Sequence, residues 1–170
     1  MARRARYLLD ADVLVQAHRR HYKFEIAPGF WDCLIWHYKQ HAVCSIDKIR
    51  KEILDGKDAL SQWVKRDCPA SFFESTGAPA VGKRYGEIVQ WAYAQKRYKP
   101  EALSKFATVA DGWLVAYAAE LSLTVVTQEV SAPESKSGVK VPDVCDAFKV
   151  PCIDTFDLLE KLGVILTWKS

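Results

Sequence analysis

Residues 7–15, Tyr-Leu-Leu-Asp-Ala-Asp-Val-Leu-Val, decide the fold of this 170-residue chain. The apolar residues 7–9 predict a short buried strand, and Asp10 and Asp12 form an acidic turn directly after it. The apolar residues 13–15 then open a helix. A strand that leads straight into a helix is typical of α/β proteins built around a parallel sheet.

The same alternation of helices and strands continues along the chain. The expected helices cover 30–41, 47–55, 59–66, 81–97, a short stretch from Pro100, 109–121 with Thr108 as its cap, a turn after Pro142, and 155–162. The expected later strands cover 42–46, 123–127 and 150–153, and 69–79 and 128–140 are expected to be loops. The pattern predicts a single α/β domain over 1–170, with a central, mostly parallel sheet in a three-layer α/β/α arrangement.

The composition excludes a disordered and a fibrous protein. A hydrophobic share of 49% and a charged share of 26% are those of an ordinary globular chain. The net charge of +3 is compatible with nucleic acid or small anions as partners. Five cysteines without a C-x-x-C motif favour a reducing, cytoplasmic location. The longest apolar run, 112–126, contains Glu120 and is too short to span a bilayer, so we expect no membrane partner.

Acidic residues stand at the expected strand ends and helix starts, where open α/β sheets place their sites. They are Asp10 and Asp12, Glu52 on the helix after the second strand, Asp111 at the start of a buried helix, and Glu129 after the third strand. Each has an ordinary explanation alone, such as a helix cap or a solvated side chain. Together, buried carboxylates need a counter-charge, most simply a divalent cation with oxygen ligands. We therefore expect the carboxyl groups of Asp10, Glu52 and Asp111 to lie within about one coordination shell of a common point.

The order and spacing of these segments resemble the PIN domain over about residues 6–163. The segments are Tyr7-Leu8-Leu9-Asp10-Ala11-Asp12-Val13-Leu14, Glu52 on its helix, Ala110-Asp111, and Val125-Val126-Thr127-Gln128-Glu129. Three further segments resemble a PIN-like branch related to VapC-type toxin ribonucleases: Phe30-Trp31-Asp32, Val141-Pro142-Asp143-Val144-Cys145 and Cys152-Ile153-Asp154. The resemblance implies a metal-dependent endoribonuclease that hydrolyses RNA phosphodiester bonds. It also implies the toxin of a toxin–antitoxin pair, with a cognate antitoxin and a second copy of the chain as partners.

The resemblance also implies roles for individual residues. Asp10, Glu52 and Asp111 match the acidic positions that hold Mg²⁺ or Mn²⁺. Asp12 stands where the family usually has Asn or Ser, so it adds negative charge to the site. Either Glu129 or Asp143 is the fourth acidic ligand, and the catalytic set is Asp10, Glu52, Asp111 and Glu129. Thr127 matches a hydroxyl position near the metal, and the basic residues Arg6, Lys48 and Lys51 are candidates for binding substrate phosphates.

Two other functions remain open from the sequence. Asp10-Ala11-Asp12-Val13 also fits the signature of haloacid-dehalogenase-like phosphatases, with Asp10 as nucleophile and Asp12 as acid or base. The further residues of that site would be Thr127, Lys136 or Lys140, and Asp154 with Asp157, which leaves Glu52 and Asp111 without a role. The second alternative is a non-catalytic zinc or RNA-binding module built on Cys33, His37, His41 and Cys44.

Overall fold

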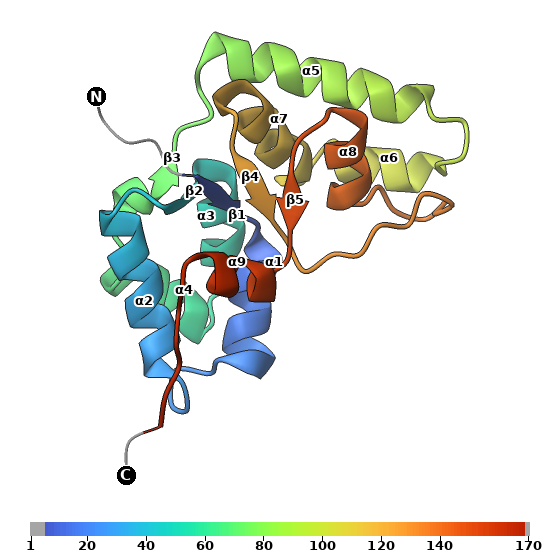
Figure 1. The fold of residues 1–170 in the computed structure, drawn as a ribbon. Coiled ribbons are helices and arrows are strands. Elements are labelled where there is room, and N and C mark those ends of the chain that lie inside the picture. Colours follow the sequence, from blue (N-terminus) through green and yellow to red (C-terminus); the bar gives the residue numbers. More distant parts are fainter. Residues whose placement is uncertain (1–5, 169–170) are drawn as a thin grey trace.

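A five-stranded parallel sheet forms the centre of the protein (Figure 1), in the strand order β3-β2-β1-β4-β5. The strands are β1 (Tyr7–Leu9), β2 (Val43–Ile46), β3 (Phe73–Glu74), β4 (Thr124–Val126) and β5 (Cys152–Ile153). The structure is a computed structural model that describes residues 6–168. Residues 1–5 and 169–170, which the predicted domain includes, lie outside the described residues.

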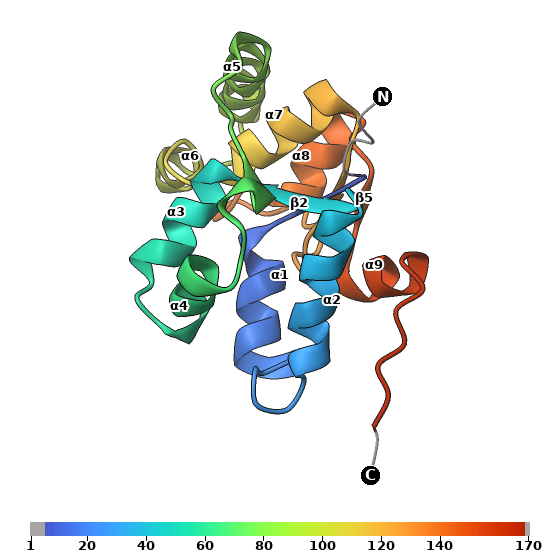
Figure 2. The same ribbon diagram turned by 90° about the vertical axis from the view of Figure 1, so that its left-hand side faces the viewer.

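Helices cover both faces of this sheet. They are α1 (Ala11–Gln16), which continues as the π-helix η1 (Ala17–His21), α2 (Pro28–Lys39), α3 (Asp47–Asp55), α4 (Ala59–Arg66), the 3₁₀ turn η2 (Ala70–Phe72), α5 (Pro79–Ala94), α6 (Pro100–Phe106), α7 (Asp111–Leu121), α8 (Val141–Ala147) and α9 (Thr155–Lys161). Figure 2 shows α5, α6, α7 and α8 on one side of the sheet and α1, α2 and α9 on the other. The predicted three-layer α/β/α arrangement is therefore confirmed. Within residues 6–168, no helix is long and apolar enough to cross a membrane.

Burial on both faces explains the uninterrupted apolar strands. Leu8 and Leu9 in β1 and Val125 and Val126 in β4 are fully buried, as expected for a parallel sheet between two layers of helices. Helix α7 is apolar almost all round because it packs against both β4 and α5. A side chain at Gly112 would place its Cβ 3.0 Å from the ring of Tyr85, so glycine there allows α5 and α7 to approach closely.

Two local predictions were wrong. The stretch 69–79, predicted to be a loop, contains η2 and the edge strand β3, which is too short to carry a hydrophobic pattern and pairs with β2 through Ser45 and Ile46. The predicted cap of α7 was also wrong, because the Thr108 hydroxyl donates to the carbonyl of Lys105 at 2.8 Å. Helix α7 begins at Asp111 instead.

The carboxyl ends of the strands meet at one edge of the sheet. The backbone N–H of Asp10 donates to the carbonyl of Val126 at 2.9 Å, and that of Thr127 donates to Ile153 at 3.0 Å. The Ser45 hydroxyl, at the end of β2, donates to the carbonyl of Leu9 at 2.7 Å. The residues that follow β1 and β4 are thereby fixed next to one another, and several of them are acidic.

Candidate active site

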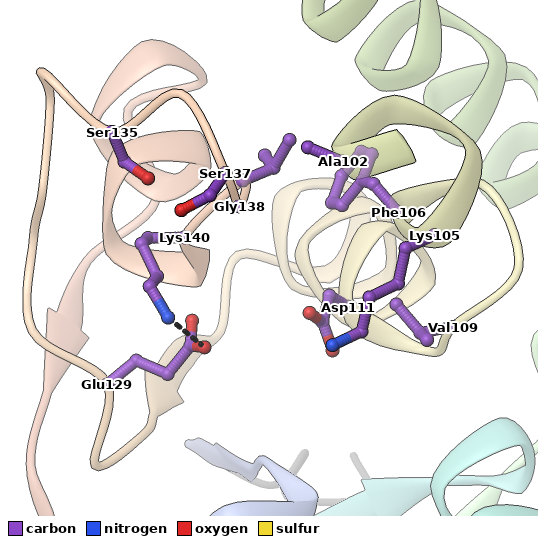
Figure 3. Close-up of a pocket in the computed structure, with 11 residues that line it drawn as sticks. Ala102, Lys105, Phe106, Val109, Asp111, Glu129, Ser135, Ser137, Gly138 and Lys140 are labelled. Carbon is purple, nitrogen blue, oxygen red and sulfur yellow. Dashed lines mark hydrogen bonds and ion pairs between the residues drawn. The ribbon is translucent and has the colours of Figure 1, made fainter. Parts of the chain in front are cut away.

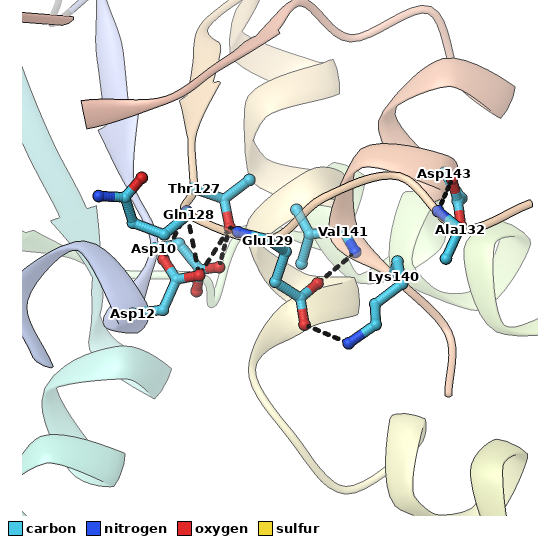
Figure 4. A network of polar contacts seen from close by, with 9 residues as sticks. All are labelled: Asp10, Asp12, Thr127, Gln128, Glu129, Ala132, Lys140, Val141 and Asp143. Atoms are coloured by element: carbon cyan, nitrogen blue, oxygen red, sulfur yellow. Dashed lines mark hydrogen bonds and ion pairs between the residues drawn. The ribbon is translucent and has the colours of Figure 1, made fainter. Parts of the chain in front are cut away.

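Asp10 and Asp12 are joined to the end of β4 by a hydrogen-bond network (Figure 4). Asp10 caps α1, with its Oδ1 accepting from the N–H of Ala11 at 2.7 Å, and its Oδ2 lies 2.8 Å from the Thr127 hydroxyl. That hydroxyl also lies 3.1 Å from Oδ2 of Asp12, whose carboxylate accepts from the N–H of Gln128 at 3.0 Å. Thr127 therefore holds both carboxylates, in keeping with its predicted place beside the site.

Glu52 and Asp111 bring two further helices to the same site. Asp111 is the first residue of α7, and Glu52 lies on α3, where its Oε1 accepts from the N–H of Ala110 at 2.8 Å. This bond anchors the start of α7 to α3. Within residues 6–168, no hydrogen bond or ion pair reaches the Asp111 carboxylate.

The electrostatic interactions between these side chains define one acidic cluster. Asp10 is repelled by Asp12 and Asp111, Asp12 is repelled by Glu129, and Asp111 is repelled by Glu129, Glu52 and Asp12. We call Asp10, Asp12, Glu52, Asp111 and Glu129 the acidic cluster. Its members come from the end of β1, α1, α3, α7 and the segment after β4, which are distant in sequence.

Burial and mutual repulsion raise the pKa values inside the acidic cluster. Burial, followed by repulsion from Glu129, Glu52 and Asp12, raises the pKa of Asp111 to about 7. Burial, then Asp12 and Asp111, hold the pKa of Asp10 well above its usual range against the lowering effect of Thr127 and Ala11. Burial also raises the pKa of Asp12, although the N–H of Gln128 lowers it. The fully ionised cluster is thus electrostatically unfavourable, and a bound cation would relieve it.

The oxygen donors of the cluster suit Mg²⁺ or Mn²⁺. Nevertheless, within residues 6–168 no three His, Cys, Asp or Glu side chains are grouped so that they could hold a metal ion. The expected convergence of Asp10, Glu52 and Asp111 on one point is therefore absent. One physical reason is that the like charges of the carboxylates repel one another. The other is that Glu52 accepts a hydrogen bond from the N–H of Ala110, and Glu129 accepts one from the N–H of Val141. The cluster has the chemistry of a metal site, and its glutamates must reorient to complete one.

Glu129 lies at the junction between the acidic cluster and a basic side chain. Its Oε2 accepts from the N–H of Val141 at 2.8 Å, and its Oε1 pairs with Nζ of Lys140 at 3.3 Å. A cavity of about 180 Å³ lies beside this pair and is also lined by Asp111 and Lys105. Figure 3 shows Lys140 beside Glu129 and Lys105 beside Asp111. Sequence reasoning gave Lys140 no role in a nuclease site, because nothing in the polar stretch 128–140 marks it out.

Asp143 does not share these interactions. Its Oδ1 accepts from the Ser131 hydroxyl, and the N–H of Ala132 donates to the same carboxylate at 3.1 Å. In Figure 4 Asp143 lies on the far side of Glu129 and Lys140 from Asp12. Of the two candidates for a fourth acidic ligand, Glu129 lies in the cluster, whereas Asp143 accepts hydrogen bonds from the loop that contains Ser131 and Ala132.

The basic candidates fall into two groups. Lys48 and Lys51 lie on α3 next to Glu52, where they line a cavity beside the cluster. Arg6 precedes β1, at the opposite end of that strand from Asp10. Asp10 follows Arg6 by four positions, which in extended chain is a distance of about 13 Å. The structure therefore places Lys48 and Lys51 at the site and Arg6 away from it.

The residues of the two alternative functions are assembled only in part. Asp10, Asp12 and Thr127, which the phosphatase alternative also uses, lie together, whereas Asp154 caps α9, with its Oδ1 accepting from the N–H of Asp157 at 2.8 Å. The zinc alternative fails because the described part of the chain holds no group of three potential zinc ligands. Its Cys44 is buried in β2, where burial raises the pKa of the thiol to about 12, so the thiolate that zinc requires is disfavoured.

Comparison with solved structures identifies the fold. FitAcB from Neisseria gonorrhoeae superposes with a TM-score of 0.53 at 19% identity, over 86% of this chain and 96% of that chain. FitAB bound to the IR36 DNA fragment gives 0.53 at 19% identity, over 87% and 94%. VapBC2 from Rickettsia felis, bound to a DNA fragment from its promoter, gives 0.51 at 16% identity, over 87% and 97%. At these identities the likeness concerns the fold alone, which is PIN-like.

Family comparison covers almost the whole chain. No curated protein matches the sequence. A family model described as a domain of unknown function, DUF4411, matches residues 7–166. This range includes every member of the acidic cluster and each strand of the sheet. The chain therefore belongs to the DUF4411 family, and in this chain the matched domain has a PIN-like fold.

Proposed function

We propose that the protein is a divalent-metal-dependent endoribonuclease that hydrolyses phosphodiester bonds of RNA. The observation that carries the proposal is the acidic cluster at the carboxyl edge of a PIN-like sheet, with Asp111 left without a hydrogen-bond donor and its pKa raised to about 7. Carboxylates arranged in this way repel RNA unless a cation neutralises them. A metal-dependent reaction on a phosphodiester reconciles the cluster with such a substrate.

In this proposal the residues of the site have three roles: metal binding, orientation of the metal-binding carboxylates, and binding of a substrate phosphate. Asp10, Asp12, Glu52, Asp111 and Glu129 would hold Mg²⁺ or Mn²⁺. Bound there, the ion would supply an activated water and stabilise negative charge on the phosphate. Thr127 orients Asp10 and Asp12 through its hydroxyl. Lys140, which neutralises Glu129, becomes available for a substrate phosphate when Glu129 turns toward the cluster.

We also propose a toxin role, with an antitoxin protein as a partner and a homodimer as the assembly. The support is the likeness to FitAcB and VapBC2, which are complexes of PIN-like toxins with their antitoxins. A cytoplasmic location would accompany this role. Co-expression of the chain with the gene that adjoins its own, followed by purification through a tag on one protein, tests for the antitoxin.

The test of the nuclease is cleavage of a mixed RNA pool with Mn²⁺ or Mg²⁺. We expect wild-type protein and the exposed control Asp146→Asn to cut RNA, and EDTA or Asp111→Asn to abolish cutting. Asp111→Asn also distinguishes the nuclease from the phosphatase, because only the nuclease needs this residue. Hydrolysis of p-nitrophenyl phosphate that depends on Asp10 but not on Asp111, without RNA cleavage, would overturn the proposal.

A further inference from the structure

A second cavity, of about 220 Å³, lies between α3 and the start of α7. Lys48, Lys51, Asp55 and Trp113 line it, together with Glu52 of the cluster. Val109 lines this cavity and also the one beside Lys140, so the two cavities adjoin. A chain-like ligand could therefore run from one to the other past Glu52 and Asp111.

The indole of Trp113 is held firmly at the wall of this cavity. The ring of Tyr85 stacks on it with centroids 3.9 Å apart and planes 9° from parallel. Tyr85 is itself fixed, because its hydroxyl donates to the carbonyl of Ala107 at 3.0 Å and its ring packs against Gly112. An aromatic ring kept in one orientation is a suitable platform for a planar ligand, since little conformational entropy is lost on binding.

Two of the four charged side chains that line the cavity, Lys48 and Lys51, can bind a phosphate, and the other two are Glu52 and Asp55. Tyr85 covers one face of the Trp113 ring, and Nζ of Lys48 lies 5.1 Å from the ring centroid over the other face, so a base reaches the indole when Lys48 turns away to bind a phosphate. Within residues 6–168 neither Lys48 nor Lys51 forms an ion pair, whereas Lys140 does. Both ammonium groups can thus accept an anionic partner without first leaving a carboxylate. The exposed Asp55 carboxylate adds an acceptor for amino or imino groups.

We propose that this cavity, which we call the Trp113 pocket, binds one nucleotide of single-stranded RNA, with the phosphate on Lys48 and Lys51 and the base on the face of Trp113 that Lys48 leaves when it turns to the phosphate. The proposal rests on the proposed ribonuclease function and names the part of the substrate that this side of the site holds. Bases that stack on protein side chains must be unpaired, which is why the substrate is single-stranded here. The strand then continues past the acidic cluster toward Lys105 and Lys140.

The test is binding of a fluorescein-labelled single-stranded RNA of about eight nucleotides, measured by anisotropy in EDTA at low salt. A second RNA of the same length carries abasic sites, which keep the phosphates and remove the bases. We expect Trp113→Ala to weaken binding of the intact RNA about tenfold and to leave binding of the abasic RNA unchanged. Lys48→Ala should weaken both and lower the salt dependence of log K by about 0.7 per log unit of salt.

Matched controls are available elsewhere in the chain. Trp36 on α2 is 57% exposed, and Lys161 on α9 is exposed, both on the other side of the sheet from α7. Trp36→Ala and Lys161→Ala should bind both RNAs as the wild type does. Trp113→Phe, which keeps an aromatic ring, should lose less affinity than Trp113→Ala, and thermal melting of each variant checks that it is folded.

Distinct results would overturn the two proposals separately. Equal loss on intact and abasic RNA in Trp113→Ala, or equal losses in Trp113→Ala and Trp36→Ala, would overturn the Trp113 pocket while RNA cleavage by the wild type persisted. If the wild type neither bound nor cleaved any RNA, the ribonuclease function would fail, and the pocket assignment with it.

Discussion

Asp111 and Asp143 occupy equivalent local positions and have opposite surroundings. Each lies in the first turn of a helix, α7 or α8, where a carboxylate favours the helix dipole. The Asp143 carboxylate accepts hydrogen bonds from Ser131 and Ala132. The Asp111 carboxylate is repelled by Glu129, Glu52 and Asp12, is attracted only more weakly by Lys105, and accepts no hydrogen bond within the described residues. The hydrogen-bond donors around a helix-start aspartate therefore distinguish Asp143, which holds a loop, from Asp111, which is left in the acidic cluster, although both occupy the same position in their helices.

Asp47 supports the same distinction. It lies in the first turn of α3, and its carboxylate accepts from the hydroxyl of Thr76 at 2.8 Å and from the N–H of Thr76 at 3.2 Å. Asp47 thereby ties the segment after β3 to α3. Like Asp143, it is satisfied by a neighbouring loop, so Asp111 is the exception among these helix-start aspartates.

The largest expected effect is the response to metal. Under the proposed function, Mn²⁺ at a hundred times its Kd should stabilise the wild type by about 2.7 kcal/mol, because an ion that binds only the folded cluster favours the folded state. Asp111→Asn should lose most of this stabilisation, and Asp143→Asn should keep it. Thermal melting with and without Mn²⁺ measures the effect. Equal responses of the two variants would break the comparison.

The next effect concerns stability without metal. Asp143→Asn should lower the free energy of unfolding by about 1–3 kcal/mol, because it weakens the acceptor for Ser131 and Ala132 inside a largely buried turn. RNA cleavage per folded molecule should remain. Urea denaturation followed by circular dichroism gives the stability, and Asp146→Asn, exposed on the same helix, is the control.

The pH dependence sharpens the comparison further. Burial and repulsion raise the pKa of Asp111 to about 7 in the folded protein, whereas it is near 4 in the unfolded chain. Between about pH 4 and pH 7 the Asp111 carboxyl group is therefore protonated in the folded state and ionised in the unfolded state. Its contribution to stability is therefore complete below about pH 4 and is lost as the pH rises to about 7. At pH 8 Asp111→Asn should be more stable than the wild type, by about 1–2 kcal/mol. Melting temperatures across this range in EDTA test it, and unchanged pH dependence in the variant would contradict it.

The smallest effect belongs to Thr127. Its hydroxyl lowers the pKa of both Asp10 and Asp12, so Thr127→Val should raise both pKa values and move the acidic limb of the pH–activity profile to higher pH. Activity at neutral pH should fall about tenfold or less, which corresponds to about 1.4 kcal/mol or less. Thr127→Ser, which retains the hydroxyl, should restore the profile. A uniform loss of activity without a shift would indicate a purely structural role.

Much of the fold could be predicted because its signals are local. The bounds of α3 and α4 agree with the predicted helices at 47–55 and 59–66. Gly56 follows the last residue of α3, and Asp58 caps the beginning of α4. Strands β1 and β4 are recognisable as apolar runs that end in polar residues. Strand β3 was missed because its two residues contain no repeat and pair only through contacts with a distant strand.

The site could be predicted only in part. The sequence placed Glu52 on the helix after the second strand, and from there its carboxylate accepts from the N–H of Ala110 at the start of α7. Whether Glu129 or Asp143 joins the cluster depends on how the chain folds after β4, which no local pattern records. The stacking of Trp113 on Tyr85 and the pairing of Lys140 with Glu129 likewise depend on tertiary contacts.

The central place of β1 in the sheet has a consequence for synthesis on the ribosome. Asp10 is translated more than a hundred residues before Val126 and Thr127, yet its backbone N–H donates to the carbonyl of Val126 and its carboxylate accepts from the hydroxyl of Thr127. A nascent chain that has not yet released β4 from the ribosome cannot assemble the acidic cluster. Any activity of this site therefore requires that β4 and the segment after it have been made and have left the ribosome.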